Sequence, residues 1–274
     1  MPEAELRPES YRFLQDYVYR ESGIVLDGDK RYLLEARLSH IVHQMRLGSL
    51  NDLCVMLGGS ANNALLKRQV VEAMTTNETF FFRDAAQYDA LRSVVVPNLI
   101  AQRQDTRKMS FWSAASSSGQ EAYSLAIMLL EMGLGDWKIR IHGTDLSSQM
   151  AERAQRGRYL QIEVNRGLPI GYLVKYFVRI GLEWQLKDEV RRMVDFTTFD
   201  LRQSMCARGP FDVVFCRNVL IYFDVEAKRR ILDEIHGTLF RGGYLLLGGS
   251  ETTLNLTTRF ERRILGQTVL YQAP

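Results

Sequence analysis

Apolar positions in the first third of the chain recur at the spacing of amphipathic helices. Phe13, Leu14, Tyr17 and Val18 share one helical face, and Gly23 ends the segment. Two further segments repeat the pattern, with apolar positions at Leu33, Leu34, Leu38, Ile41 and Met45 and at Leu65, Leu66, Val70, Val71 and Met74. No strand-like alternation precedes residue 108. The pattern predicts a small all-α domain in this part of the chain.

Beyond a further amphipathic helix at 85–103, short apolar runs alternate with helical segments. The runs predict strands at 109–115, 139–145, near 194, 211–216, 244–249 and 266–271, and helices at 121–132, 148–156 and 225–240. Short strands that are apolar throughout are typical of parallel sheets covered on both faces. The predicted fold class is therefore α/β, with a doubly wound parallel sheet.

One segment interrupts this alternation. The connection at about 158–194 is far longer than the handful of residues that usually joins a helix to a strand. It contains KYFVRI, then Gly181, then LEWQL, which is the pattern of a β-hairpin. We therefore predict a small antiparallel β insertion over these residues.

Composition and charge narrow the function classes. The chain of 274 residues is 46% hydrophobic, and its net charge of +3 is too small to argue for a nucleic-acid or anionic membrane partner. No apolar run approaches the ~18 residues of a membrane span, and no signal peptide is expected. Three irregularly spaced cysteines predict reduced thiols, and His40 and His43 lack a third metal ligand. We expect a metal-free cytoplasmic protein.

Residues suited to a ligand follow the first two predicted strands, where open α/β sheets bind their ligands. The loop from Ala114 to Gly119 has small side chains and leads into a helix N-terminus, but an ordinary tight turn has the same composition. Asp145 ends the second strand, where an acid binds ribose hydroxyls in nucleotide-binding sheets. The alternative is a cap for the next helix, and we favour the ribose.

Asp200 and Leu201 follow the third strand, and Arg217, Asn218 and Val219 follow the fourth. The sequence contains no P-loop, and the loop after the first strand has a single glycine, which is poor for a pyrophosphate. A ligand with adenosine and a carboxylate but no phosphates suits these residues better. S-adenosylmethionine is such a ligand.

Five motifs, spread over nearly the whole chain, resemble those of the CheR-type chemotaxis receptor methyltransferases. They are TTNETFFFRD (75–84), WSAASSSGQEAYSLA (112–126), GTDLSSQMAERAQRGRY (143–159), FDVVFCRNVLIYFD (211–224) and LLLGGSE (245–251). The resemblance implies a Rossmann-like class I S-adenosylmethionine-dependent methyltransferase sheet with a small antiparallel β insertion, preceded by a small all-α domain. The implied domains are 1–75 (helical), 76–95 (linker and active-site segment) and 96–274 (methyltransferase).

The resemblance also implies the activity: glutamate side chains of chemoreceptor cytoplasmic helices are methylated with S-adenosyl-L-methionine, giving glutamyl methyl esters and S-adenosyl-L-homocysteine. The implied cofactor-binding residues are Asn77, Thr79, Arg83, Glu121, Asp145, Asp200, Leu201, Asn218 and Val219. The family's GEEPYS is GQEAYS here, so Gln120 is not carried over, and Asp200 replaces an asparagine. The family often has cysteine or alanine at Ser116 and threonine at Ser118. The serines here are also small, so we expect the loop to approach the cofactor in the same way.

This chemistry needs few catalytic groups. A glutamate carboxylate with a reference pKa near ~4.3 is already ionised at neutral pH, so no general base is required. By the resemblance, the catalytic residues would be Arg83, holding a carboxylate, and Tyr222, hydrogen-bonding the acceptor. Their alternatives are a surface ion pair and a core aromatic. We expect Phe80–Phe82 to pack between the domains rather than to bind adenine.

The partners implied are the cytoplasmic domains of chemoreceptors, bound by a monomer. The helix at 30–46 carries Lys30, Arg31, Arg37 and Arg46, which form either a docking surface for acidic receptor helices or a solvated face. Family members that bind a C-terminal receptor pentapeptide look to have a longer hairpin connection than Ile180–Glu183. We therefore expect no pentapeptide tether.

Two other functions remain alternatives. A nucleic-acid methyltransferase usually has [DN]PP[YF] after the fourth strand, where this chain has CRNVLIYF. A sensor that binds S-adenosylmethionine without turnover would retain the cofactor residues. Arg83, Asn218 and Tyr222 argue weakly against such a sensor.

Overall fold

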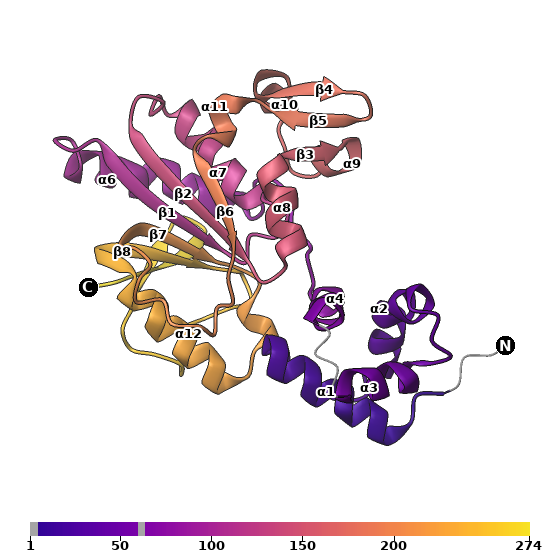
Figure 1. The fold of residues 1–274 in the computed structure, drawn as a ribbon. Helices are drawn as coiled ribbons and strands as arrows, with labels where there is room; N and C mark the ends of the chain where they lie inside the picture. The colour runs from indigo at the N-terminus through magenta and orange to yellow at the C-terminus, as the bar shows by residue number, and fades with distance from the viewer. Residues whose placement is uncertain (1–4, 60–63) are drawn as a thin grey trace. The chain divides into compact units, whose positions relative to one another are not determined.

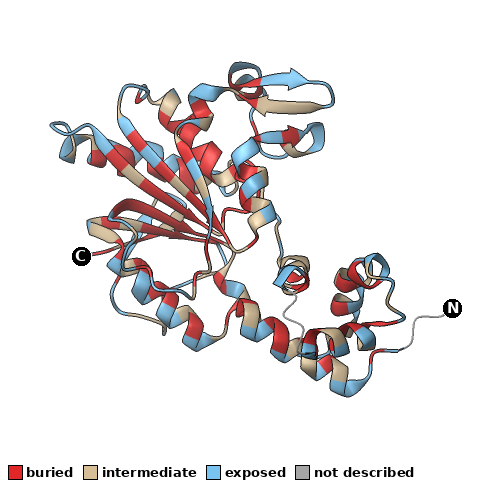
Figure 2. Cartoon of the chain, in the orientation of Figure 1, coloured by how far each residue is buried: buried red, intermediate tan, exposed pale blue. Residues whose placement is uncertain are grey.

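The computed structural model describes residues 5–59 and 64–274, which divide into two compact units (Figure 1). The first unit contains the chain up to Thr76 together with Tyr222–Asp224. The second contains Asn77–Ile221 and Val225–Pro274. Each unit has its own cluster of buried apolar residues, coloured red in Figure 2.

Helices make up the N-terminal part of the first unit over the described residues. They are α1 (Pro8–Ser22), α2 (Arg31–Gln44), α3 (Leu50–Gly58) and α4 (Ala64–Met74). The buried positions include most of the predicted apolar faces, so the predicted all-α domain is confirmed. Leu65 differs, because it lies in the first turn of α4 with 57% of its surface exposed.

Two local features of this unit differ from the sequence analysis. Helix α3 was not predicted, although Ser49 caps it by accepting a hydrogen bond from the Asp52 amide at 3.3 Å. Arg37 was considered part of either a docking surface or a solvated face, and its guanidinium donates to the carbonyls of Met74 and Thr75 at 2.7 and 2.8 Å. Arg37 therefore holds the end of α4.

The second unit is built on a seven-stranded sheet in the order β6-β2-β1-β7-β8-β10-β9. The strands are β1 (Lys108–Ala114), β2 (Lys138–Asp145), β6 (Val194–Thr198), β7 (Phe211–Cys216), β8 (Leu239–Leu247), β9 (Glu261–Leu265) and β10 (Thr268–Gln272). β6, β2, β1, β7 and β8 are parallel, whereas β10 is antiparallel to β8 and β9. The α/β class is confirmed, but the sheet is mixed, because one edge is antiparallel.

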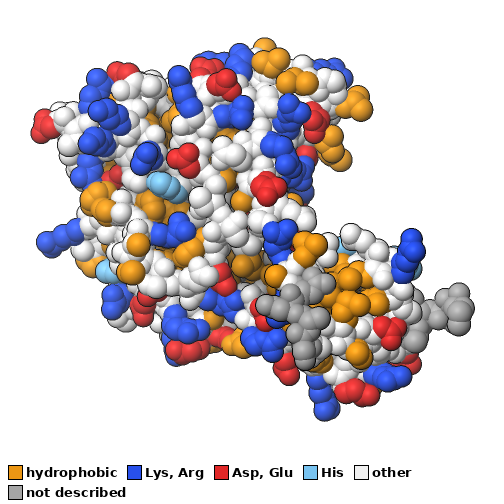
Figure 3. Space-filling model, viewed as in Figure 1, with side chains coloured by type: hydrophobic (Ala, Val, Ile, Leu, Met, Phe, Trp, Pro, Cys, Tyr) orange, Lys and Arg blue, Asp and Glu red, His pale blue; other side chains and the backbone are white. Residues whose placement is uncertain are grey.

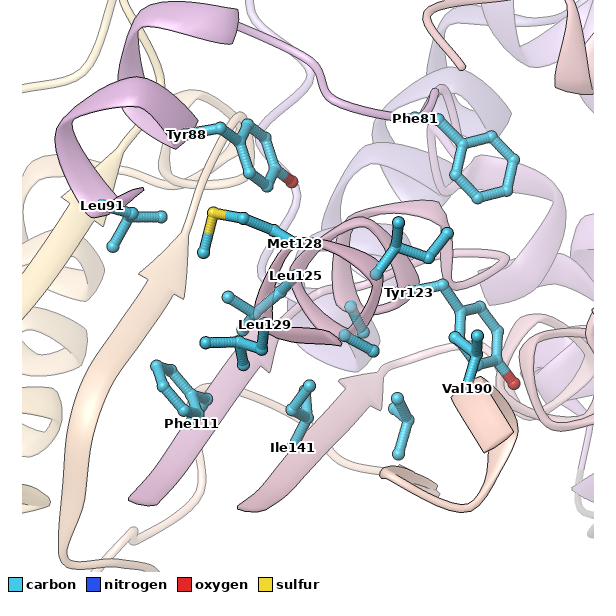
Figure 4. Packing of buried hydrophobic residues seen from close by; sticks show 14 of the residues in the cluster. Phe81, Tyr88, Leu91, Phe111, Tyr123, Leu125, Met128, Leu129, Ile141 and Val190 are labelled. Atoms are coloured by element: carbon cyan, nitrogen blue, oxygen red, sulfur yellow. The ribbon is translucent and has the colours of Figure 1, made fainter. Parts of the chain in front are cut away.

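Helices cover both faces of this sheet (Figure 1). They are α5 (Ala85–Ala90), a π-helical turn (Leu91–Val95), α6 (Val96–Gln102), α7 (Gln120–Glu131), α8 (Ser148–Arg156) and α12 (Val225–Gly237). Figure 4 shows Leu125, Met128 and Leu129 of α7 packed toward Phe111 and Ile141 of the sheet. The helix predicted at 225–240 ends at Gly237, because β8 already begins at Leu239.

The predicted β insertion is present as a three-stranded antiparallel sheet in the order β3-β5-β4. Its elements are β3 (Arg158–Leu160), α9 (Gln161–Val164), α10 (Ile170–Tyr176), β4 (Phe177–Ile180), β5 (Glu183–Leu186) and α11 (Asp188–Arg191). Gly181 has φ 62° in the two-residue turn between β4 and β5, a conformation that favours glycine.

The three phenylalanines of the NETFFFRD motif do not have the role expected of them. Phe81 is fully buried within the second unit, with its ring 5.1 Å from that of Tyr159 and 5.8 Å from that of Phe177. Phe82 packs against Tyr88. The expectation that they pack between the domains is therefore wrong for these two, because the insertion supplies aromatic partners inside the second unit.

Candidate active site

Four strand ends meet at one edge of the second unit's sheet. β1 lies between β2 and β7, so the chain leaves the centre of the sheet in opposite directions on its two sides. In open α/β sheets a ligand binds at this point, beside the carboxyl ends of the strands. The loops that follow Ala114, Asp145, Thr198 and Cys216 therefore form the candidate site.

The loop after β1 has an unusual backbone. Ala115 and Ser117 have φ angles of 56° and 50°, a region that side-chain-bearing residues enter at a cost of about 1–3 kcal/mol. Gly119 follows at φ 94°, and a Cβ there would lie 2.9 Å from the Cβ of Ala154. This conformation is held by the Ser117 hydroxyl, which donates to the Asn77 carbonyl at 2.8 Å. Asn77 thus lies beside the first strand end.

Asp145 joins this loop to the one after β2. Its carboxylate accepts from the Ser117 amide at 2.8 Å and from the Ser147 amide at 2.9 Å, and only 7% of the residue is exposed. The N-cap of α8 is Ser147, whose hydroxyl accepts from the Met150 amide at 3.2 Å. Capping the helix is therefore the role of Ser147, and Asp145 links two strand-end loops.

An ion-pair triad centred on a buried arginine lies beneath the same edge. The guanidinium of Arg217 is 2.8 Å from the Glu121 carboxylate and 2.5 Å from that of Asp84, and its side chain is 2% exposed. Glu121 also accepts from the Ser113 hydroxyl at 2.7 Å. Burial acts to lower the pKa of Arg217, but Glu121 and Asp84 outweigh it, so the pKa lies above its usual value. Arg217 therefore remains charged.

Glu251 holds the last two loops of the site together. Its Oε2 accepts from the amides of Asn218 and Gly248, both at 2.7 Å, and its Oε1 accepts from the Val219 amide at 2.9 Å. A Cβ at Gly248 would lie only 2.5 Å from Asn218 Nδ2. The loop after β7 is thus fixed to the loop after β8, although Glu251 was not among the predicted site residues.

The remaining predicted cofactor residues lie on loops of the second unit. Phe199 donates its amide to the Asp145 carbonyl at 2.8 Å, which brings the Asp200–Leu201 pair beside β2. Asp200 is ion-paired to Arg202 at 2.6 Å, and Leu201 is buried. An asparagine at position 200 would carry no charge, so the ion pair with Arg202 depends on the aspartate found here.

Arg83 lies in the segment between Asn77 and α5. Its guanidinium is 5.2 Å from the centre of the Phe80 ring, and its best hydrogen bond, to the Glu78 carbonyl, is long at 3.4 Å. No carboxylate lies within ion-pair distance of Arg83 among residues 5–59 and 64–274. Glu78 pairs instead with Arg166, whose guanidinium is 4.8 Å from the same ring. The alternative of a surface ion pair for Arg83 is therefore not observed, and Thr79 is half-buried beside it.

Tyr222 is the one predicted site residue that belongs to the first unit. There its carbonyl accepts a hydrogen bond from the Val25 amide at 2.9 Å, and it is half-buried rather than a core aromatic. It ends the short 3-10 helix Leu220–Tyr222.

Two of the three cysteines are buried thiols. Burial raises the pKa of Cys54 to about 11 and raises that of Cys216 well above its ordinary value, so both are protonated at neutral pH. In the part of the chain that the structure describes, no three His, Cys, Asp or Glu side chains gather as metal ligands. No described helix has the length and hydropathy to cross a membrane.

Comparison with known proteins identifies the family. Residues 77–268 match the model of the "CheR methyltransferase, SAM binding domain", and residues 9–75 match the "CheR methyltransferase, all-alpha domain". The chain belongs to the CheR methyltransferase family. Its cofactor is therefore S-adenosylmethionine, and the family resemblance inferred from the five motifs is confirmed.

Relatives match the CheR-family chain over almost its whole length. Chemotaxis protein methyltransferase 1 of Pseudomonas aeruginosa is 39% identical over 269 residues, covering 96% of this chain and 97% of the relative. The chemotaxis protein methyltransferase of Vibrio parahaemolyticus is 39% identical, with 96% of each chain covered. A solved structure of the N-methyltransferase MtfA with S-adenosylmethionine matches loosely, at 15% identity and a TM-score of 0.35, over 61% of this chain and 52% of that one. The protein is a methyltransferase of chemotaxis.

The side chains at the strand ends fit S-adenosylmethionine. Glu121 and Asp200 are already paired with Arg217 and Arg202, whereas the Asp145 carboxylate accepts from two backbone amides at the strand ends. A carboxylate has further lone pairs, so Asp145 can also accept hydrogen bonds from ribose hydroxyls. This acceptor agrees with the cofactor of the family.

Proposed function

We propose that this enzyme methylates glutamate side chains on the cytoplasmic helices of chemoreceptors. Bound S-adenosylmethionine supplies a methyl group activated by the positive charge of its sulfur. The acceptor carboxylate is already ionised at neutral pH, so the protein needs to align it and remove water rather than deprotonate it. This agrees with a site in which the described residues offer no His–Asp pair or activated thiol.

The observation that carries the proposal is Arg83, a guanidinium without an ion-pair partner at the end of the NETFFFRD motif. A carboxylate, of the acceptor or of the cofactor, would complete its hydrogen bonding. In this proposal Arg83 and Tyr222 act on the acceptor. The cofactor is held by Asn77, Thr79, Arg83, Glu121, Asp145, Asp200, Leu201, Asn218 and Val219. The reaction would take place in the cytoplasm, and the enzyme would act as a monomer.

The test is methyl transfer from labelled cofactor to receptor cytoplasmic fragments. We expect label that alkali releases as methanol, because esters are base-labile, whereas methylated amines and bases are not. Arg83→Ala should lower turnover by about 10- to 100-fold, the equivalent of a lost charged hydrogen bond. Arg166→Ala is the matched control, since Arg166 lies over the same Phe80 ring, and it should change turnover less than threefold.

Base-stable label in the receptor fragments would contradict the ester, and label transferred to added nucleic acid instead would favour the nucleic-acid alternative. Cofactor binding without any transfer to receptor fragments would favour the sensor. A cysteine-free variant that loses activity while Arg83→Ala keeps it would contradict direct transfer to the carboxylate.

We also propose that recognition does not need a receptor pentapeptide tether. The support is the two-residue β4–β5 turn, which leaves little backbone to clamp the end of a peptide added along the edge strand β4. Titration with a receptor-tail pentapeptide ending in an aromatic residue should give no binding, and a tail-truncated receptor should be fully methylated. Micromolar affinity, near −8 kcal/mol, would contradict this. If the pentapeptide does not bind, recognition rests on the N-terminal helices. Arg31→Glu should then slow methylation without weakening cofactor binding.

A further inference from the structure

A polar hollow lies in the methyltransferase unit, at the edge of the sheet opposite the candidate active site. It has a volume of about 860 Å³ and is lined where β1, β2, β6 and β7 begin. The candidate active site lies where the same strands end. β1 spans seven residues, so the two edges are roughly 20 Å apart at about 3.3 Å per residue. The hollow is therefore separate from the site of methyl transfer.

Its lining is strongly basic. The charged lining residues are Arg103, Lys108, Lys138, Arg140 and Arg192, against Asp195 and Asp212. Their net charge equals the +3 of the entire chain, so the rest of the sequence is balanced. Figure 3 shows Lys and Arg side chains gathered on the side of this unit where β1 and β2 begin. The lining residues alone account for the chain's excess of positive charge. This charge is therefore concentrated at the hollow rather than distributed over the whole surface.

One cation of the hollow is fixed in place. Arg103 donates to the buried carboxylate of Asp212 at 2.9 Å, and its guanidinium lies 4.3 Å from the centre of the Phe240 ring. Asp212, which is 2% exposed, also accepts from the Ser110 amide at 2.9 Å. The carboxylate is thus engaged on both oxygens, which leaves Asp195 as the second acid facing the hollow.

The other four cations lack such partners. Within the described ranges, no carboxylate lies within 4 Å of the charged groups of Lys108, Lys138, Arg140 or Arg192. Met109, Ile139, Met193 and Phe240 supply an apolar floor between them. Several unpaired cations around an apolar floor complement an anion that carries more than one charge and a flat organic part.

We propose that this hollow binds a small polyphosphate ligand of the nucleoside triphosphate class. The unpaired cations bind the phosphates, and the apolar floor contacts the base. The volume lies within the roughly 300–1,000 Å³ typical of small-molecule sites.

The test is calorimetric titration of the full chain with adenosine triphosphate, inorganic triphosphate and adenosine, without metal ions and with saturating S-adenosylhomocysteine to fill the cofactor site. We expect adenosine triphosphate to bind with a Kd below 1 mM and to weaken as salt is raised. Tighter binding of the nucleotide than of inorganic triphosphate identifies the nucleotide, and equal binding identifies the phosphate chain alone. Lys138→Glu with Arg140→Glu should weaken binding at least tenfold and leave cofactor affinity within twofold.

Lys228→Glu with Arg230→Glu on α12 is the control, because it makes the same change in charge away from the hollow. It should weaken binding less than threefold. No binding of either triphosphate, or equal loss in both double variants, would overturn the proposal. Adenosine binding as tightly as its triphosphate would overturn it as well, because the cations would then have no part.

Discussion

Replacing Arg217 with methionine is expected to lower the free energy of unfolding by about 3–5 kcal/mol, the usual cost of removing one partner of a buried ion pair. Glu121, whose side chain is 12% exposed, would lose its counter-ion without gaining water. The three tryptophans, Trp112, Trp137 and Trp184, all lie in the second unit, so their fluorescence in urea follows the unfolding of that unit alone. Glu226→Gln removes one partner of an exposed pair and should cost at most about 1 kcal/mol.

A second substitution separates charge from packing at this position. Adding Glu121→Gln to Arg217→Met removes the unpaired carboxylate, so the double variant should recover more than 1 kcal/mol relative to Arg217→Met, roughly the cost of an unsatisfied buried charge. If the double variant were less stable than Arg217→Met, the loss would come from shape and hydrogen bonding rather than from an uncompensated charge. The ion pair with Arg217 would then not be the interaction that stabilises the Glu121 carboxylate.

The parts of the site that follow strands could be predicted from local sequence. Apolar runs locate the strands, and the topology of an α/β sheet then brings residues such as Asp145 and Asn218 to one edge. The small side chains from Ala114 to Gly119 also indicate a close backbone turn, and the structure adds that three of these residues have positive φ. Fold class and the position of the candidate site therefore follow from pattern alone.

The residues that fix the site could not be predicted in this way. Arg217 and Glu121 are 96 residues apart, and Glu251 and Asn218 are 33 apart, so no local periodicity couples them. Glu251 even lies within a quoted motif, but its role depends on four backbone amides from two loops. Strand β9 was missed for another reason: four of its five residues are exposed, so it has no apolar pattern.

Replacing Asp145 with alanine is expected to weaken binding of S-adenosylmethionine by about 1.5–3 kcal/mol, a roughly 10- to 150-fold rise in Kd, if its carboxylate holds the ribose. The physical reason is that a buried hydroxyl pair would lose a charged acceptor in a place that water reaches poorly, since Asp145 is 7% exposed. Calorimetry with S-adenosylhomocysteine measures this without turnover.

The same substitution also frees the amides of Ser117 and Ser147, so a control must separate loss of the ribose contact from loosening of the loops. Ser147→Ala removes the cap of α8 at a cost of about 1 kcal/mol in stability while leaving the Asp145 carboxylate in place. That variant disturbs the same loop but keeps the carboxylate. If Asp145 contacts the ribose directly, Ser147→Ala should therefore change the affinity for S-adenosylhomocysteine less than threefold. Equal losses of affinity in both variants would assign Asp145 a purely structural role, and unchanged affinity in Asp145→Ala would place the ribose elsewhere.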